Sequence, residues 1–356
     1  MVNRKVAPIP VPPGATLLEQ IEIWNMTQKE LSLRLGMSTK HLNEIIKGKS
    51  PITIETALKL ESVLGLPASF WVGLEASYQE AVTRSNCELI DEKEKEIADS
   101  INYAEIAKLG WVKKTRETQN KIDNLRAFFG IANLNYIPLL IPIAFRKSEK
   151  YISSEYALAA WLRKGEISAQ EIQTDRYLKS KLKKAIPEIR KLTLKPLEEI
   201  IDTLTYLFAD CGIALAIVPH ISQTHVNGAI KWISPDKIML QLSLKGKYSD
   251  FFWFSLFHEI GHIFFGHNKK GTFIDIPGVD SEMETEADNF AKNILIPQQE
   301  YSSFIASQQF AEQNIEKFAQ RIGINQGIIV GRLMHDKLIT FNQLHHLREK
   351  CCMNYN

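Results

Sequence analysis

One apolar stretch limits what this chain can fold into more than any other feature. Between Phe251 and Phe265 the only ionisable side chains are His258, Glu259 and His262, in the pattern H-E-x-x-H. An α-helix places positions i and i+4 about 40° apart, so both imidazoles lie on one face and can reach one metal ion. Burying three ionisable groups in an apolar helix is costly without a partner. The pattern therefore predicts a buried helix with a zinc site.

The glutamate of this pattern indicates chemistry rather than metal binding alone. Glu259 lies one position round the helix from His258, beside the metal, where a carboxylate can act as general base towards a zinc-bound water. A catalytic zinc also needs a third protein ligand and an open fourth position. The next predicted helix offers the carboxylates Glu282, Glu284, Glu286 and Asp288.

Helical spacing favours one of these carboxylates as the third ligand. Glu284 and Asp288 are four positions apart and share a face, so Glu284 is expected to bind zinc while Asp288 accepts the free N–H of a ligating histidine. Glu286 points about 160° away from Glu284. Glu286 and Glu282 remain competing candidates, because an acidic first turn also complements the helix dipole.

Three further features near this region receive weaker predictions. His267 lies five positions after His262, about 140° away on a helix, and is predicted to be a rim or surface residue. His225, near a predicted turn, is a candidate for polarising a bound carbonyl. The strand predicted at Ile238–Ser243 is a candidate for pairing with an extended substrate by edge addition.

A second pattern, near the start of the chain, is typical of DNA binding. Thr27 and Ser38 are predicted to cap two short helices joined by a turn at Gly36. The N-terminal end of the second helix can enter the major groove, where Asn43 suits adenine and Lys40 suits guanine. The candidate DNA contacts are Gln28, Ser38, Thr39, Lys40, Asn43, Lys47 and Lys49.

The net charge of the whole chain and the charge of the segment 38–49 point to different conclusions about DNA binding. The net charge of the whole chain is +2, which alone does not suggest nucleic acid as a partner. Between Ser38 and Lys49, however, three lysines accompany a single glutamate, Glu44. Local positive charge decides phosphate contact, so the predicted second helix remains a candidate for DNA binding.

Periodicity and turn signals predict an α+β fold that is mostly helical. We expect an N-terminal bundle of five helices, a helical middle region, and a C-terminal zincin-like domain in which a small sheet precedes the H-E-x-x-H helix. Prolines at 187 and 196 are expected to break the middle helices. The predicted domains are 1–85 for DNA binding, 86–195 for the helical middle, 196–300 for the zinc domain and 301–356 for a helical tail.

Composition and cysteine usage indicate a cytoplasmic protein. No apolar run reaches the roughly 18 residues of a membrane span. The segment Met1–Gly14 contains four prolines and no apolar core, unlike a secretory signal. No two of the four cysteines form a C-x-x-C pair, so we expect reduced thiols without a role: Cys87, Cys211, Cys351 and Cys352.

The N-terminal motifs resemble those of XRE-type repressors, most closely HigA-like antitoxins. The matching residues begin at Pro13-Gly14 and run through Leu35-Gly-Met-Ser and Gly48-Lys-Ser-Pro-Ile-Thr to Phe70-Trp71. The resemblance implies operator DNA as a partner. It also implies a homodimer, because paired recognition helices bind half-sites about one DNA turn apart. The chain departs from the family at Lys40-His41, which leaves the operator sequence open.

The C-terminal motifs resemble the ImmA/IrrE metallopeptidases. The matching stretches are 254–263 and 284–297, with further likeness in 228–243 and 318–333. The resemblance implies Zn²⁺ held by His258, His262 and Glu284, with Glu259 catalytic, and substrates that are mostly helix-turn-helix repressors. A partner or signal is often needed for cleavage in that family.

Two functions are compatible with this sequence. The first is a DNA-binding regulator with a zinc endopeptidase domain that cleaves itself, a partner repressor or an antitoxin. The second is a non-enzymatic antitoxin or repressor whose zinc domain senses a signal or binds a toxin. The complete catalytic set favours the first.

Overall fold

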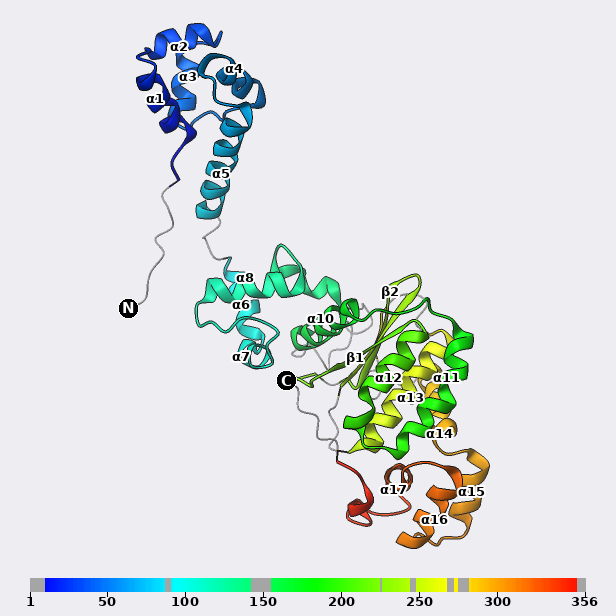
Figure 1. Ribbon diagram of the computed structural model, residues 1–356. Helices are drawn as coiled ribbons and strands as arrows, with labels where there is room; N and C mark the ends of the chain where they lie inside the picture. Colours follow the sequence, from blue (N-terminus) through cyan, green and yellow to red (C-terminus); the bar gives the residue numbers. More distant parts are fainter. Residues whose placement is uncertain are drawn as a thin grey trace. The chain divides into compact units, whose positions relative to one another are not determined.

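Contacts divide the chain into two units, Met1–Asp91 and Glu92–Asn356, which are described separately (Figure 1). The computed structural model describes residues 10–86, 91–141, 155–224, 226–243, 248–267, 272–274 and 282–350. In that part of the chain, none of the helices has the length and apolar character needed to cross a membrane.

The first unit is a bundle of five helices around one apolar core. Its fully buried members include Leu17, Leu31, Leu60 and Trp71. At Gly14 a Cβ would lie 2.1 Å from the carbonyl oxygen of Ile46, so this glycine allows the first and third helices to pack backbone to backbone. The helices are α1 (Pro13–Ile23), α2 (Gln28–Arg34), α3 (Thr39–Ile46), α4 (Ile54–Leu64) and α5 (Ala68–Asn86).

Side-chain caps start the helices where the sequence predicts them. The hydroxyls of Thr27 and Ser38 accept hydrogen bonds from the backbone N–H groups of residues 30 and 41, each at 3.1 Å. Satisfying these orphan donors stabilises a short helix by about 1 kcal/mol each. The side chain of Glu30, in the first turn of α2, accepts a hydrogen bond from Arg34 at 2.6 Å.

The second unit begins with helices, several of which cover one face of a sheet. A core of this region joins α8 and α10 to the sheet residues Ala216, Val218 and Ala229. Within α11, Pro187 lies inside the helix instead of breaking it, which corrects the expectation from sequence. The elements are α6 (Glu92–Ser100), α7 (Tyr103–Lys108), α8 (Thr118–Phe129), η1 (Leu134–Leu140), α10 (Glu155–Glu171), α11 (Lys179–Lys191), η3 (Leu192–Leu194) and α12 (Leu197–Asp210).

In the part of the chain that the structure describes, the sheet has four strands in the order β1-β3-β2-β4. They are β1 (Ile213–Val218), β2 (Gly228–Ser234), β3 (Lys237–Ser243) and β4 (Thr272–Ile274), the last of which sequence patterns did not predict. Strand β3 pairs in parallel with β1 and antiparallel with β2, so both of its edges are occupied. The expectation that a substrate adds to the edge of this strand is therefore wrong.

The remaining helices pack on the other face of the sheet in one continuous core. This core includes Leu215 and Leu240 from the sheet, Leu256 from α13, and Phe318 and Leu333 from the last helices. Figure 1 shows α12 and α13 on the side of the sheet opposite α10. The elements are α13 (Ser249–Phe265), α14 (Glu282–Leu295), α15 (Gln298–Ala306), α16 (Glu312–Ile322), α17 (Gln326–His335) and η4 (His345–Leu347).

A single arginine joins two helix ends in this core. The guanidinium of Arg190 donates to the carbonyls of Ile294 and Leu295 at the end of α14, at 2.7 and 3.0 Å. It also donates to the carbonyls of Ile322 and Gly323 at the end of α16, at 2.8 and 3.4 Å. Helix C-termini leave carbonyls without partners, and the planar guanidinium supplies enough donors to satisfy several at once. The fold as a whole is thus the mostly helical α+β arrangement predicted from sequence.

Candidate metal centre

The H-E-x-x-H segment lies in α13, which is buried along most of its length. His258 is 5% exposed, and Glu259 and His262 are fully buried. Helix α14 packs closely on α13, because at Gly261 a Cβ would lie only 3.0 Å from the Cα of Ala287. This close approach brings the carboxylates of α14 within reach of the two imidazoles.

Three side chains converge with the spacing of a metal site. Potential ligand atoms of His258, His262 and Glu284 all lie within 4.8 Å of one another. The two Nε2 atoms are 2.9 Å apart, and Oε2 of Glu284 is 3.1 Å from one and 3.6 Å from the other. Tetrahedral zinc ligands at about 2.1 Å from the ion lie roughly 3.4 Å from each other. The donor set and its spacing therefore fit a zinc ion.

The protonation of these groups also suits a cation. Burial alone would raise the pKa of Glu284, but hydrogen bonds with His258 and His262 outweigh it and lower the pKa to about 2. Burial lowers the pKa of His262, which favours the neutral imidazole. Metal ligation needs an ionised carboxylate and neutral imidazoles, so Glu284 and His262 each favour the form that ligation needs.

The hydrogen bond expected behind the first histidine is present. Oδ1 of Asp288 lies 3.0 Å from Nδ1 of His258, and the other carboxylate oxygen accepts from Nζ of Lys292 at 3.1 Å. Burial raises the pKa of Asp288, but these two hydrogen bonds outweigh it and lower the pKa to about 2. A carboxylate in this place orients the imidazole so that its Nε2 faces the metal position.

Behind the second histidine lies a pair that sequence reasoning missed. Nδ1 of His262 is 2.9 Å from Nδ1 of His267, whose Nε2 is 2.9 Å from Oε2 of Glu286. Of the two places expected for His267, rim or surface, the surface is wrong, since only 9% of its side chain is exposed. The helical angle misleads because α13 ends at Gly266, where φ is +79° and the chain turns back. The glycine after the apolar run was the available signal.

The competing carboxylates of α14 occupy other places. Glu286 contacts His267 instead of the two ligand nitrogens, and Glu282 is exposed at the first turn of the helix. His225 lies outside the described residues. Of the three candidates for the third ligand, Glu284 is the carboxylate that the structure brings to both imidazoles.

Glycine at the start of β2 makes room for the buried glutamate. A Cβ built on Gly228 would lie 2.1 Å from Oε1 of Glu259. The carboxylate therefore rests directly against the backbone of this strand, next to the two histidines on its own helix. This contact of Gly228 could not be predicted, because nothing in a single sequence shows which glycine faces which side chain.

The candidate DNA contacts lie in the first unit and are mostly exposed. Thr39, Lys40 and Lys47 are exposed on or at the end of α3, and Lys49 is exposed just beyond it. Ser38 caps α3 through its hydroxyl, while Gln28 and Asn43 are half-buried. Thr39 also exchanges a hydrogen bond with Ser32 at 3.1 Å, which ties the start of α3 to α2.

Family models match both parts of the chain. Residues 25–71 match a model described as a helix-turn-helix, and residues 250–334 match one described as an IrrE N-terminal-like domain. Two separate stretches of the chain are thus similar to a helix-turn-helix and to an IrrE N-terminal-like domain. The chain has the make-up of a DNA-binding regulator with a protease-like domain. Comparison with curated proteins gave no match.

Two solved structures resemble part of the chain. An addiction module antidote protein of a HigA family from Coxiella burnetii is 29% identical over 22% of this chain and 90% of that chain, with a TM-score of 0.21. A protein described as an antidote of a plasmid maintenance system from Nostoc punctiforme is 20% identical over 25% of this chain and 93% of that chain, with a TM-score of 0.22. TM-scores this low support no structural argument.

Proposed function

We propose that this protein is a DNA-binding regulator whose second unit is a zinc-dependent endopeptidase. The observation that supports it most directly is the convergence of His258, His262 and Glu284 beside the fully buried Glu259. Two imidazoles and one carboxylate make a three-ligand set that leaves a fourth position for water or substrate. Bound zinc would polarise a peptide carbonyl and increase the acidity of a water molecule.

The protein's own residues would perform the proton transfers. The carboxylate of Glu259 would take a proton from the water while the oxygen of that water bonds to the peptide carbon. It would then pass that proton to the leaving amine as the peptide C–N bond breaks. Asp288 and His267 would hold the two imidazoles in the orientation that ligation needs.

The proposed DNA contacts are those of α3 and its ends. Exposed Lys40, Lys47 and Lys49 supply positive charge for phosphates and base edges, and Asn43 supplies a donor–acceptor pair for adenine. A homodimer remains part of the proposal, because a single recognition helix covers only one half-site. Sedimentation of the purified chain with and without DNA tests the dimer.

The decisive experiment compares the wild type with Glu259→Gln, each expressed with its genomic neighbours. We expect about one zinc per chain in both proteins, and a cleaved partner or self-cleavage product only with the wild type. Elemental analysis measures the metal, and mass spectrometry identifies the cleaved bond. Glu282→Gln, an exposed carboxylate on α14, is the matched control and should cleave normally.

Three outcomes would contradict parts of the proposal. Cleavage that persists with Glu259→Gln would show that Glu259 is not the general base. Purified protein without stoichiometric zinc would contradict the proposed peptidase function. Zinc binding with no product in either protein would favour the non-enzymatic regulator, in which the metal domain senses a signal or binds a toxin.

A further inference from the structure

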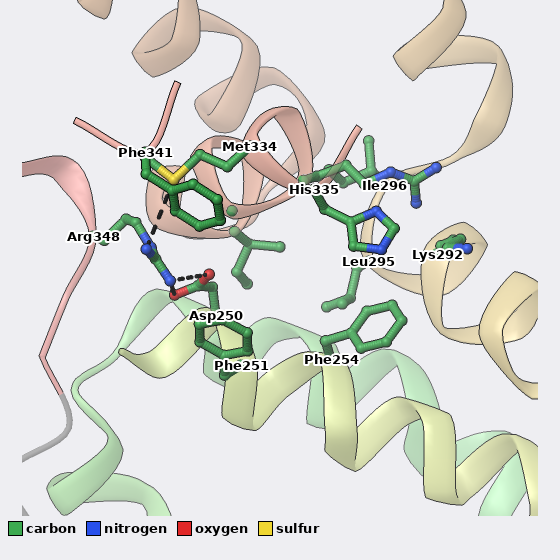
Figure 2. Close-up of a pocket in the computed structure, with 13 residues that line it drawn as sticks. Asp250, Phe251, Phe254, Lys292, Leu295, Ile296, Met334, His335, Phe341 and Arg348 are labelled. Atoms are coloured by element: carbon green, nitrogen blue, oxygen red, sulfur yellow. Dashed lines mark hydrogen bonds and ion pairs between the residues drawn. The ribbon is translucent and has the colours of Figure 1, made fainter. Parts of the chain in front are cut away.

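A cavity of about 200 Å³ lies beside the metal-binding helices of the second unit. Its walls come from α13, α14, α17 and the segment that follows α17 (Figure 2). Most of the lining side chains are apolar, among them Phe254, Leu295 and Ile328. Concave apolar sites with a few polar groups at their ends are typical of small-molecule binding.

Two aromatic side chains of the cavity wall are unusually exposed. Phe251 is 54% exposed and Phe341 is 70% exposed, and both line the cavity. Single exposed apolar side chains are ordinary, but two aromatic rings that line one apolar cavity form an apolar patch of the kind that marks binding sites. The cavity therefore has an apolar body with an apolar entrance.

One end of the cavity is closed by a rigid ion pair. The guanidinium of Arg348 binds both carboxylate oxygens of Asp250 at 2.9 to 3.2 Å, and both side chains are almost fully buried. The missing side chain of Gly331 leaves the space that this carboxylate fills, since a Cβ there would lie 2.1 Å from Oδ2. This end is neutral and offers a ligand little free hydrogen-bonding capacity.

The other end holds two ion pairs whose cations keep donors to spare. Figure 2 shows Lys292 and His335 at the end opposite Arg348, and Arg332 also lines the cavity. Lys292 pairs with Asp288 at 3.1 Å, and Arg332 pairs through Nε with Asp336 at 2.7 Å and lies over the ring of Tyr301, 4.9 Å from its centroid. An ammonium has three N–H donors and a guanidinium has five. The spare donors favour an anionic group at this end.

We propose that the cavity binds a small carboxylic acid with an apolar body. The body lies against Phe254, Leu295 and Ile328, and the carboxylate accepts hydrogen bonds from Lys292 and Arg332. At roughly 30 Å³ for a water-sized group, the cavity holds about seven such groups, which suits a ligand of about eight non-hydrogen atoms. Hexanoate has this size and is the simplest probe.

The same cavity contacts the supports of the candidate metal centre. The ring of Phe254 lies 6.2 Å from that of His258, centroid to centroid. Lys292 binds Asp288, which in turn contacts His258. A ligand carboxylate bound to Lys292 adds a second negative charge to the ammonium that already pairs with Asp288, so occupation of the cavity changes zinc affinity, and zinc changes ligand affinity by the same factor. This coupling rests on the proposed function, whereas binding itself does not.

The experiment is calorimetric titration of the full chain, free of metal and loaded with zinc. Hexanoate is compared with 1-hexanol and hexylamine, which share its apolar body but are neutral and cationic. We expect saturable binding of one hexanoate per chain, about tenfold tighter than hexanol because hydrogen bonds to charged groups are strong, with hexylamine weakest. No saturable binding, or equal affinities for hexanoate and hexanol, overturns the proposal.

Variants place the site within the fold. Lys292→Met keeps the approximate length of the side chain and removes one of the two cations, so hexanoate affinity should fall towards that of hexanol while hexanol affinity stays unchanged. Lys317→Met, on α16 outside this cavity, is the matched control and should bind like the wild type. Unchanged hexanoate affinity with Lys292→Met overturns the site even if the acid binds the protein elsewhere. Arg332→Met repeats the test on α17, should Lys292→Met fail to fold.

The two proposals fail in different ways. If hexanoate binds the metal-free chain but the purified protein takes up no stoichiometric zinc, the cavity proposal stands and the peptidase proposal fails. Stoichiometric zinc without hexanoate binding gives the reverse result. Hexanoate affinity that is the same with and without zinc overturns the coupling between the two sites.

Discussion

Because Gly228 has no side chain, the carboxylate of Glu259, the candidate general base, fits against this strand. Substitution by alanine puts a Cβ 2.1 Å from Oε1 of Glu259, so the carboxylate must move. A displacement of about 1 Å costs roughly 100-fold in rate. We expect Gly228→Ala to cleave about 100-fold more slowly than the wild type with unchanged zinc content, measured by product formation and elemental analysis.

Gly73→Ala supplies the control, because a Cβ at that helical position meets nothing within 4 Å. Cleavage by Gly228→Ala at the wild-type rate would mean that the position of the Glu259 carboxylate does not limit the reaction. Loss of zinc together with activity would point to a wider disturbance of the site.

His267 is expected to act through its neighbour rather than on substrate. If Nε2 of His262 binds zinc, its Nδ1 has the proton, and His267 must accept it while donating its own N–H to Glu286. Removing such a support costs about 10- to 100-fold in metal affinity. We predict this loss for His267→Ala, measured by competition with a chromogenic chelator.

The conservative variant His267→Asn keeps an acceptor oxygen and should recover part of the affinity. Glu282→Gln, on the same helix as Glu286 but exposed, should bind zinc normally. Wild-type zinc affinity in His267→Ala would show that the contact with His262 is incidental.

At the scale of elements, local signals predicted most helices and strands but not their partners. The caps at Thr27 and Ser38 and the apolar run of α13 depend on neighbouring residues, which a sequence displays directly. The pairing of β3 on both edges depends on distant segments, so alternation alone could not distinguish a central strand from an edge strand.

The candidate site shows the same division. Helical spacing brought His258, Glu259 and His262 together and favoured Glu284 and Asp288. The contact of His267 with His262 escaped prediction because a helical angle holds only while the helix continues, and α13 ends at Gly266. The sequence predicts a helix break at Pro187, but this proline lies within α11, where packing tolerates it.

Different residues in and beside helix α3 are expected to contribute to sequence specificity and to general DNA affinity. On DNA selected from random sequence, Asn43→Ala should lose about 1–3 kcal/mol for the preferred base and relax the preference there. Lys49→Ala should weaken binding to all sequences and reduce the salt slope by about one. Binding titrations at several salt concentrations measure both effects. A uniform loss with Asn43→Ala would contradict its role in base recognition.

At the scale of the whole molecule, zinc should stabilise one unit and not the other. The candidate ligands all lie in Glu92–Asn356, and the first unit has a core of its own. A ligand present at 100 times its dissociation constant stabilises the native state by about 2.7 kcal/mol. We expect two calorimetric transitions, of which zinc raises only the one for the second unit. A shift of both by zinc would show that the units unfold together.

The position of Arg190 has a consequence for the gene as well as for the protein. Its guanidinium joins the end of α14 to the end of α16, and the core beneath them runs on into α17. A nonsense mutation near codon 300 would spare every candidate zinc ligand but remove half of the carbonyls that Arg190 binds. It would also leave apolar faces of the remaining core without cover. Cellular proteases would then clear the fragment, so the genetic outcome of such an allele is the absence of the whole second unit.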